Sequence, residues 1–193
     1  MIKRVSVYCA SSSKVDEEYK HQAYLLGTLL AQKGIVALFG SGSVGLMGEL
    51  SKGVLDHHGS IIGIIPQFMV DEGWGNPNVT EQIVTQTMHE RKKRMTEEVD
   101  AAIALPGGCG TLEELLEVIT WKQLGLYHQP IIILNVNHYY DDLLRMLDKA
   151  VEENFMREEH KKMWIVVDDA SKVIDAIEKA PGWHANAREI AAI

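Results

Sequence analysis

The chain has 193 residues, 46% of them hydrophobic and 24% charged, and these values are typical of one soluble globular domain. The formal net charge of −8 argues against a protein that binds nucleic acid through a basic face, although a local cluster of N–H groups and arginine can still hold a small phosphorylated ligand. Cys9 and Cys109 form neither a disulfide framework nor a zinc pattern, which favours a reducing, cytoplasmic location. No signal peptide or membrane-spanning run is expected.

Apolar runs and helical patterns alternate along the chain. Strands are expected over residues 5–9, 35–39, 61–65, 83–85, 101–105, 131–134 and 165–167. Helices are expected over residues 16–33, 46–58, 88–98, 111–125, 139–153 and 170–179. Residues 67–80 hold four turn-formers and are expected to be a mobile loop. This order predicts a single Rossmann-like α/β domain over residues 1–180, with a parallel sheet and helices on both faces, and a tail over residues 181–193.

The first glycine turn has the spacing Gly40-x-Gly42-x-x-Gly45 and lies between an expected strand and an expected helix. NAD binding also requires an acidic residue about 20 positions later, near the end of the next strand. Residues 61–67 contain none, so NAD is not expected. Two interpretations remain: a tight turn that allows close helix packing, or contact of Gly42 and Ser43 with a phosphate or a ribose.

A charged segment begins at Met88. Its Glu90 and Arg94 have the i,i+4 spacing of a surface ion pair. However, Met88, Arg91 and Met95 share one helical face, which turns Arg91 toward the apolar interior. A buried arginine needs an anionic partner. We therefore interpret Arg91 as a functional residue.

A second glycine turn follows the expected strand 101–105 and contains Gly107, Gly108 and Gly110. Three glycines in four positions leave the backbone uncovered, so a ligand can approach its N–H groups closely. The helix that follows directs its unpaired N–H groups and the positive end of its dipole at the same place. Phosphate is the usual anion at such a site, and these residues predict a phosphate-binding turn.

Thr111 and Glu114 admit two interpretations. Their spacing is that of a capping box, in which Thr111 caps the helix and Glu114 bonds back to the N–H of the capping residue. A carboxylate in the first turn of a helix beside a phosphate-binding turn also faces any ligand bound there. Cys109 lies at the same helix start, where its pKa can fall and make it a nucleophile. We interpret its side chain as filling the turn.

The motif Pro106-Gly107-Gly108-x-Gly110-Thr111-x-x-Glu114 resembles that of the Lonely Guy (LOG) family. The resemblance extends to Met88-His89-Glu90-Arg91-Lys92, to Gly40–Gly48 and to Leu134–Tyr140, and it covers roughly residues 3–167. Members of this family remove the base from cytokinin or adenine nucleoside monophosphates, and many carry an old lysine decarboxylase label. That label requires a pyridoxal phosphate lysine in an apolar pocket, and no lysine near the glycine turns has such a setting.

The resemblance implies that the chain hydrolyses the N-glycosidic bond of a purine nucleoside 5′-monophosphate, without a metal or an organic cofactor. Arg91 and Glu114 match the catalytic residues of the family. The implied nucleotide-binding residues are Gly42, Ser43, Arg91, Lys92, Gly107, Gly108, Cys109, Gly110 and Thr111. The resemblance also implies a homodimer, with the amphipathic helix over residues 111–126 as a suitable interface. Two alternatives stay open: a non-catalytic nucleotide sensor or carrier, and transfer of the ribosyl group to an acceptor other than water.

Overall fold

The computed structural model describes residues 1–183, so the predicted tail lies outside the described residues from position 184 on. Seven parallel strands form one sheet in the order β4-β3-β2-β1-β5-β6-β7. The strands are β1 (Arg4–Tyr8), β2 (Val36–Phe39), β3 (Ile61–Pro66), β4 (Glu81–Thr85), β5 (Ala101–Ala104), β6 (Ile131–Leu134) and β7 (Ile165–Val167).

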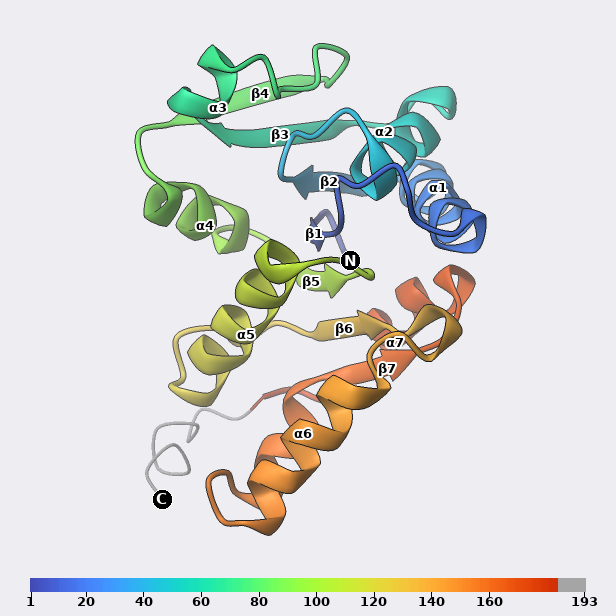
Figure 1. Cartoon of the computed structure of the whole chain (residues 1–193). Helices are drawn as coiled ribbons and strands as arrows, with labels where there is room; N and C mark the ends of the chain where they lie inside the picture. Colours follow the sequence, from blue (N-terminus) through green and yellow to red (C-terminus); the bar gives the residue numbers. More distant parts are fainter. Residues whose placement is uncertain (184–193) are drawn as a thin grey trace.

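Helices cover both faces of this sheet (Figure 1). One face carries α1 (Glu17–Gln32), α2 (Gly45–Asp56), the 3-10 turn η3 (Ala170–Lys172) and α7 (Val173–Glu178). The other face carries α4 (Met88–Thr96), α5 (Cys109–Gln123), α6 (Asp141–Glu152) and the 3-10 turn η2 (Glu158–Met163). The short helix α3 (Gln67–Asp71) and the 3-10 turn η1 (Val136–His138) lie in connections. The predicted Rossmann-like α/β fold is confirmed.

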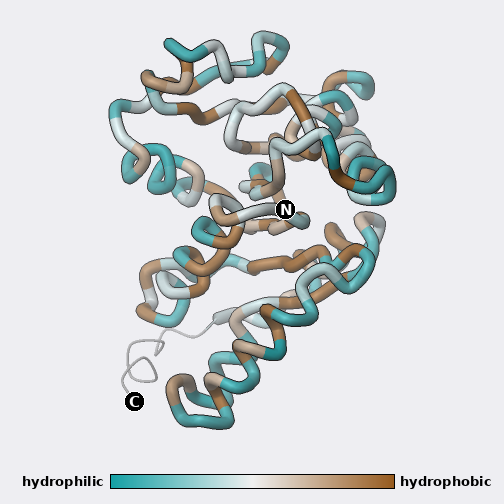
Figure 2. Tube along the Cα trace, viewed as in Figure 1, coloured by the Kyte–Doolittle hydropathy of each residue, from teal (hydrophilic) through white to brown (hydrophobic). Residues whose placement is uncertain are grey.

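The central strands are buried along their whole length because both faces of the sheet are covered. In β1, Val5 and Val7 enter the core beneath α1 and α2, whereas Tyr8 enters the core beneath α4 and α5. Figure 2 shows the apolar residues concentrated on the strands and on the inward sides of the helices. Within residues 1–183, no helix has both the length and the apolar content needed to cross a bilayer.

The expected mobile loop over residues 67–80 is wrong in part, since residues 67–71 form α3. Five residues are too few for a helical period to show in the sequence. The helix predicted from residue 111 begins at Cys109. Strands β1 to β4 succeed one another toward one edge of the sheet, and β5 to β7 toward the other. The winding therefore reverses between β1 and β5, where ligands bind in open α/β sheets.

Candidate active site

A cavity of about 350 Å³ lies at this reversal point. Its wall is built from the loop after β1, from α2, α3 and α4, and from the first turns of α5. The lining residues are Cys9, Ala10, Ser11, Ser12, Met47, Met69, Met88, Arg91, Gly108, Gly110, Thr111 and Glu114. The fold thus brings the two predicted catalytic residues together with the second glycine turn.

Arg91 and Glu114 form a buried ion pair at the cavity. The Arg91 Nη1 donates to Glu114 Oε1 at 2.8 Å, and the two side chains are only 7% and 8% exposed. The Arg91 Nε donates to the Ile64 carbonyl at 3.1 Å. One guanidinium therefore ties α4 both to β3 and to the first turns of α5, and it faces an anionic partner as its place on the helix predicted.

The first glycine turn makes room for side chains. A Cβ atom on Gly40 would lie 2.4 Å from the Arg91 Nη2, and one on Gly42 would lie 2.7 Å from the Met47 sulfur. Ser43 lines a separate groove beside α1 and α2. The structure therefore favours close packing for this turn, and neither Gly42 nor Ser43 lines the Arg91 cavity.

Burial dominates the electrostatics of Glu114. It raises the pKa of the carboxyl group, while the positive charge of Arg91 opposes that rise. Burial, together with the charge of Glu114, also raises the pKa of the neighbouring Cys9 thiol. A carboxylate in such a low-dielectric site can accept a proton or stabilise a positive charge that develops next to it.

The N-terminus of α5 opens toward the same cavity. The Leu112 N–H donates to the Gly108 carbonyl at 3.0 Å, and no side chain caps this helix. The N–H groups of residues 108–111 therefore lack partners within the helix and are available to an anion. The capping-box interpretation is wrong: Gly108 occupies the N-cap, so Thr111 is the third helical residue, and Glu114 bonds Arg91 instead.

Three predicted binding residues have other surroundings. The Lys92 Nζ bonds Glu113 and, at 3.1 Å, Glu117, so that it joins α4 to α5 instead of lining the cavity. Gly107 packs against Thr111, because a Cβ atom on Gly107 would lie 2.1 Å from the Thr111 hydroxyl oxygen. The Cys109 side chain is exposed.

The spacing of Glu90 and Arg94 allowed a surface ion pair, but the two side chains have other partners. The Glu90 carboxylate instead accepts the backbone N–H of Gln86 at 2.8 Å, just before the start of α4. Arg94 lies 3.7 Å from Glu97. The Glu90 carboxylate thus accepts a hydrogen bond from a backbone N–H group at the start of α4, where the helix dipole also favours a negative charge.

Sequence reasoning missed two parts of the wall. Ser11 and Ser12 belong to a hydroxyl-rich loop at the carboxyl end of β1, and the binding rule for parallel sheets could have identified them. Met47, Met69 and Met88 form an apolar wall. They come from three separate helices, so no periodicity in the sequence connects them.

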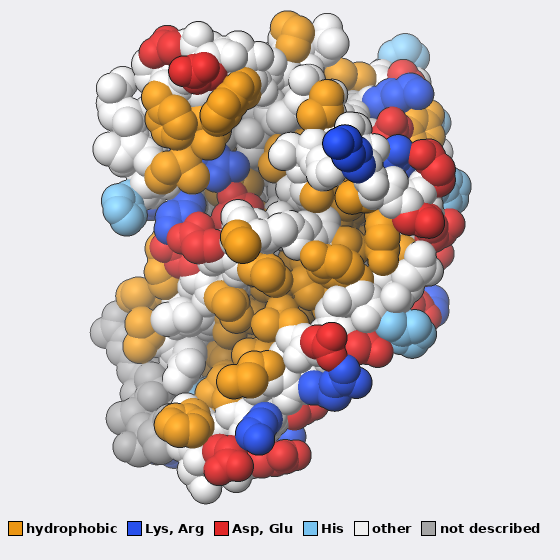
Figure 3. Space-filling view, viewed as in Figure 1, with side chains coloured by type: hydrophobic (Ala, Val, Ile, Leu, Met, Phe, Trp, Pro, Cys, Tyr) orange, Lys and Arg blue, Asp and Glu red, His pale blue; other side chains and the backbone are white. Residues whose placement is uncertain are grey.

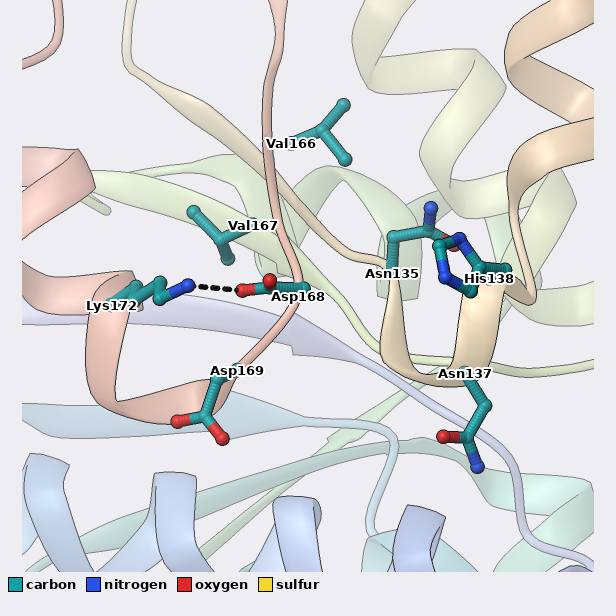
Figure 4. A pocket seen from close by; sticks show the side chains of 8 residues that line it. All are labelled: Asn135, Asn137, His138, Val166, Val167, Asp168, Asp169 and Lys172. Carbon is teal, nitrogen blue, oxygen red and sulfur yellow. Dashed lines mark hydrogen bonds and ion pairs between the residues drawn. The ribbon is translucent and has the colours of Figure 1, made fainter.

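A larger hollow of about 760 Å³ lies at the carboxyl ends of β6 and β7 (Figure 4). Its charged side chains already have partners: Lys172 donates to Asp168 at 2.7 Å, and Asp169 accepts from Gln22 at 3.0 Å. It contains none of the predicted site residues. Among residues 1–183, no group of His, Cys, Asp or Glu side chains is arranged to hold a metal ion.

The chain is similar to known proteins over most of its length. Residues 47–177 match the family model described as "Possible lysine decarboxylase". The chain is 41% identical to the probable cytokinin riboside 5′-monophosphate phosphoribohydrolase LOGL3 of Oryza sativa subsp. japonica, over 94% of this chain and 86% of the relative. It is also 41% identical to the cytokinin riboside 5′-monophosphate phosphoribohydrolase LOG7 of Arabidopsis thaliana, over 92% of this chain and 82% of the relative.

Among solved structures, the molybdenum cofactor carrier protein of Chlamydomonas reinhardtii has the same fold. It superimposes with a TM-score of 0.69 over 92% of this chain and 98% of the carrier. The two are 21% identical, a level at which the likeness concerns the fold alone. The match of the family model and the identity to LOG proteins over nearly the whole chain establish that this chain belongs to the LOG family.

Proposed function

We propose that the chain hydrolyses the N-glycosidic bond of a purine nucleoside 5′-monophosphate, releasing the free base and ribose 5-phosphate. The observation that carries this proposal is the buried Arg91–Glu114 pair, which faces a cavity shared with the open N-terminus of α5. One half of the cavity suits a phosphate, and the other half supplies a carboxylate. The names of the relatives support the same reaction class.

The geometry suggests how the substrate lies. The phosphate accepts hydrogen bonds from the N–H groups at the start of α5 and from Thr111, and the Ser11 and Ser12 hydroxyls add donors. The base then extends toward the methionine wall. Methionine side chains adapt to irregular apolar shapes, so this wall accepts adenine and also an N6-prenyl substituent.

Glu114 performs the chemistry in this proposal. As the bond from C1′ to the base breaks, its electrons leave with the base and positive charge builds at C1′. The carboxylate stabilises that charge and takes a proton from the water whose oxygen bonds to C1′, by the logic of glycoside hydrolysis. Passing this proton to the nitrogen of the departing base releases a neutral base and restores the carboxylate. Arg91 orients the carboxylate, and its positive charge opposes protonation of that group. Lys92 supports this pair from outside by joining α4 to α5.

We also propose that the chain forms a homodimer through the exposed side of α5. Leu116, Leu124 and Leu126 are 39%, 46% and 62% exposed in and just after this helix. Figure 3 shows apolar side chains gathered over α5 and α6 on one face of the molecule. A contiguous exposed apolar surface of this kind is typical of a protein interface.

A non-catalytic carrier is the competing function, and one solved structure with this fold is named as a carrier. A carrier of an anion gains nothing from a buried carboxylate in its binding cavity, because the carboxylate repels the ligand. The test is product analysis with AMP and adenosine side by side. AMP should give adenine and ribose 5-phosphate in equal amounts. Adenosine should react about 10- to 100-fold more slowly, since it lacks the charge-assisted phosphate contacts. Equal turnover of both would refute the phosphate site.

A further inference from the structure

The connection between β6 and α6 contains the motif that resembles the LOG family but takes no part in the cavity. Asn137 and His138 adopt consecutive left-handed conformations, with φ of 50° and 60°, which non-glycine residues rarely do. The Tyr140 N–H donates to the Asn135 side chain at 2.6 Å and fixes the far end of this turn. The strained backbone therefore holds two neighbouring tyrosines, Tyr139 and Tyr140, in set positions.

Both tyrosine hydroxyls donate to the turn that follows β5. Tyr139 donates to the Gly107 carbonyl at 2.7 Å, and Tyr140 donates to the Leu105 carbonyl at 2.6 Å. Between them, the Pro106 carbonyl accepts the Ala10 N–H at 3.3 Å. Three consecutive carbonyl groups of the glycine turn are thus held by neighbouring parts of the protein.

The Tyr139 bond has a consequence for the cavity. In a planar trans peptide, a carbonyl and the following N–H point in opposite directions. The bond to the Gly107 carbonyl therefore fixes the direction of the Gly108 N–H, and Gly108 lines the cavity. Donation to a carbonyl also polarises the amide, which strengthens its N–H as a donor. Tyr140 has no such effect, since the next residue, Pro106, has no N–H.

We propose that Tyr139 is a positioning residue for phosphate recognition, acting through the Gly107–Gly108 peptide. This proposal rests on the proposed function. The Tyr139 side chain is not forced into its hydrogen bond by burial, because it is 43% exposed. Its ring is instead held by edge-to-face contacts with Tyr19 at 5.9 Å and Tyr140 at 5.1 Å. The Tyr19 and Tyr139 rings also border a small apolar hollow that Gly107 and Gly108 line.

The test compares Tyr139→Phe with Tyr140→Phe, which each remove one hydroxyl from adjacent positions. Affinities for ribose 5-phosphate and for adenine are measured by calorimetry, together with the KM for AMP and the thermal midpoint. Tyr139→Phe should weaken ribose 5-phosphate binding and raise the KM about 2- to 10-fold, the effect of one hydrogen bond. Its adenine affinity, its kcat and its thermal midpoint should stay near the wild-type values. Tyr140→Phe should lower the thermal midpoint, because it leaves a buried carbonyl unpaired, and keep the ribose 5-phosphate affinity.

An unchanged ribose 5-phosphate affinity in Tyr139→Phe would overturn the proposal. So would an equal loss of that affinity in Tyr140→Phe, because the hydroxyls would then act only through stability. These affinities do not depend on turnover. If wild-type protein leaves AMP intact but Tyr139→Phe still weakens ribose 5-phosphate binding, the role of Tyr139 is supported and hydrolysis is refuted. Wild-type protein that does not bind ribose 5-phosphate overturns both.

Discussion

Replacing Glu114 by glutamine tests the stabilising and the catalytic role of the Arg91–Glu114 pair together. A glutamine in a capping box would be nearly neutral, but here it leaves the buried charge of Arg91 without a partner. Breaking a buried pair typically destabilises the fold by about 3–5 kcal/mol. Because the amide oxygen still accepts the 2.8 Å hydrogen bond, we expect the lower end, about 3 kcal/mol. In a domain of this size that lowers the thermal midpoint by about 6–12 °C.

The double variant Arg91→Met/Glu114→Gln supplies the control. It removes both charges, so urea unfolding should show it to be more stable than Glu114→Gln. With Arg91→Met as the remaining single variant of the cycle, the coupling energy should be about 1–3 kcal/mol. Neither variant can accept a proton at position 114, so both should hydrolyse AMP at least about 10²-fold more slowly than wild type. Wild-type stability in Glu114→Gln would refute the ion-pair reasoning. Near-normal turnover in a folded Glu114→Gln protein would show that the catalytic carboxylate lies elsewhere.

Three further predictions concern the surroundings of this pair. Gly40→Ala places a Cβ atom 2.4 Å from the Arg91 guanidinium and should displace it. The misplaced arginine should lower kcat/KM for AMP about 10²-fold. Unchanged kinetics would contradict this packing. Cys109→Ala keeps the backbone N–H and alters only an exposed side chain, so its kcat and KM should match wild type; loss of activity in the folded variant would indicate a thiolate role. Because burial raises the pKa of Glu114, the acid limb of the kcat/KM profile should lie at a pH above the ordinary glutamate pKa of about 4.3. Arg91→Met removes the charge that opposes this rise, so it should shift the acid limb to still higher pH. An acid limb that does not shift in Arg91→Met would exclude Glu114 as the titrating base.

The sequence predicted the sheet and the inward Arg91, because both leave periodic signals: unbroken apolar strands, and an arginine on the apolar side of a helix. It did not predict that Gly40 and Gly42 make room for Arg91 and Met47, since glycine spacing is the same whether a ligand or a side chain fills the space. The partners of Lys92 lie 21 and 25 residues further along the chain, and only the packing of α4 against α5 reveals them.

The central claim is that the Arg91–Glu114 cavity converts its nucleotide and does not merely hold it. The most direct measurement is a single-turnover experiment, in which protein in molar excess over AMP is mixed, quenched at intervals and analysed by chromatography. Our account predicts that bound AMP disappears while adenine and ribose 5-phosphate appear in equal amounts. It predicts the same course for isopentenyladenosine monophosphate. The contrary result is quantitative recovery of intact nucleotide at concentrations where calorimetry shows the nucleotide to be bound. That result would establish a carrier.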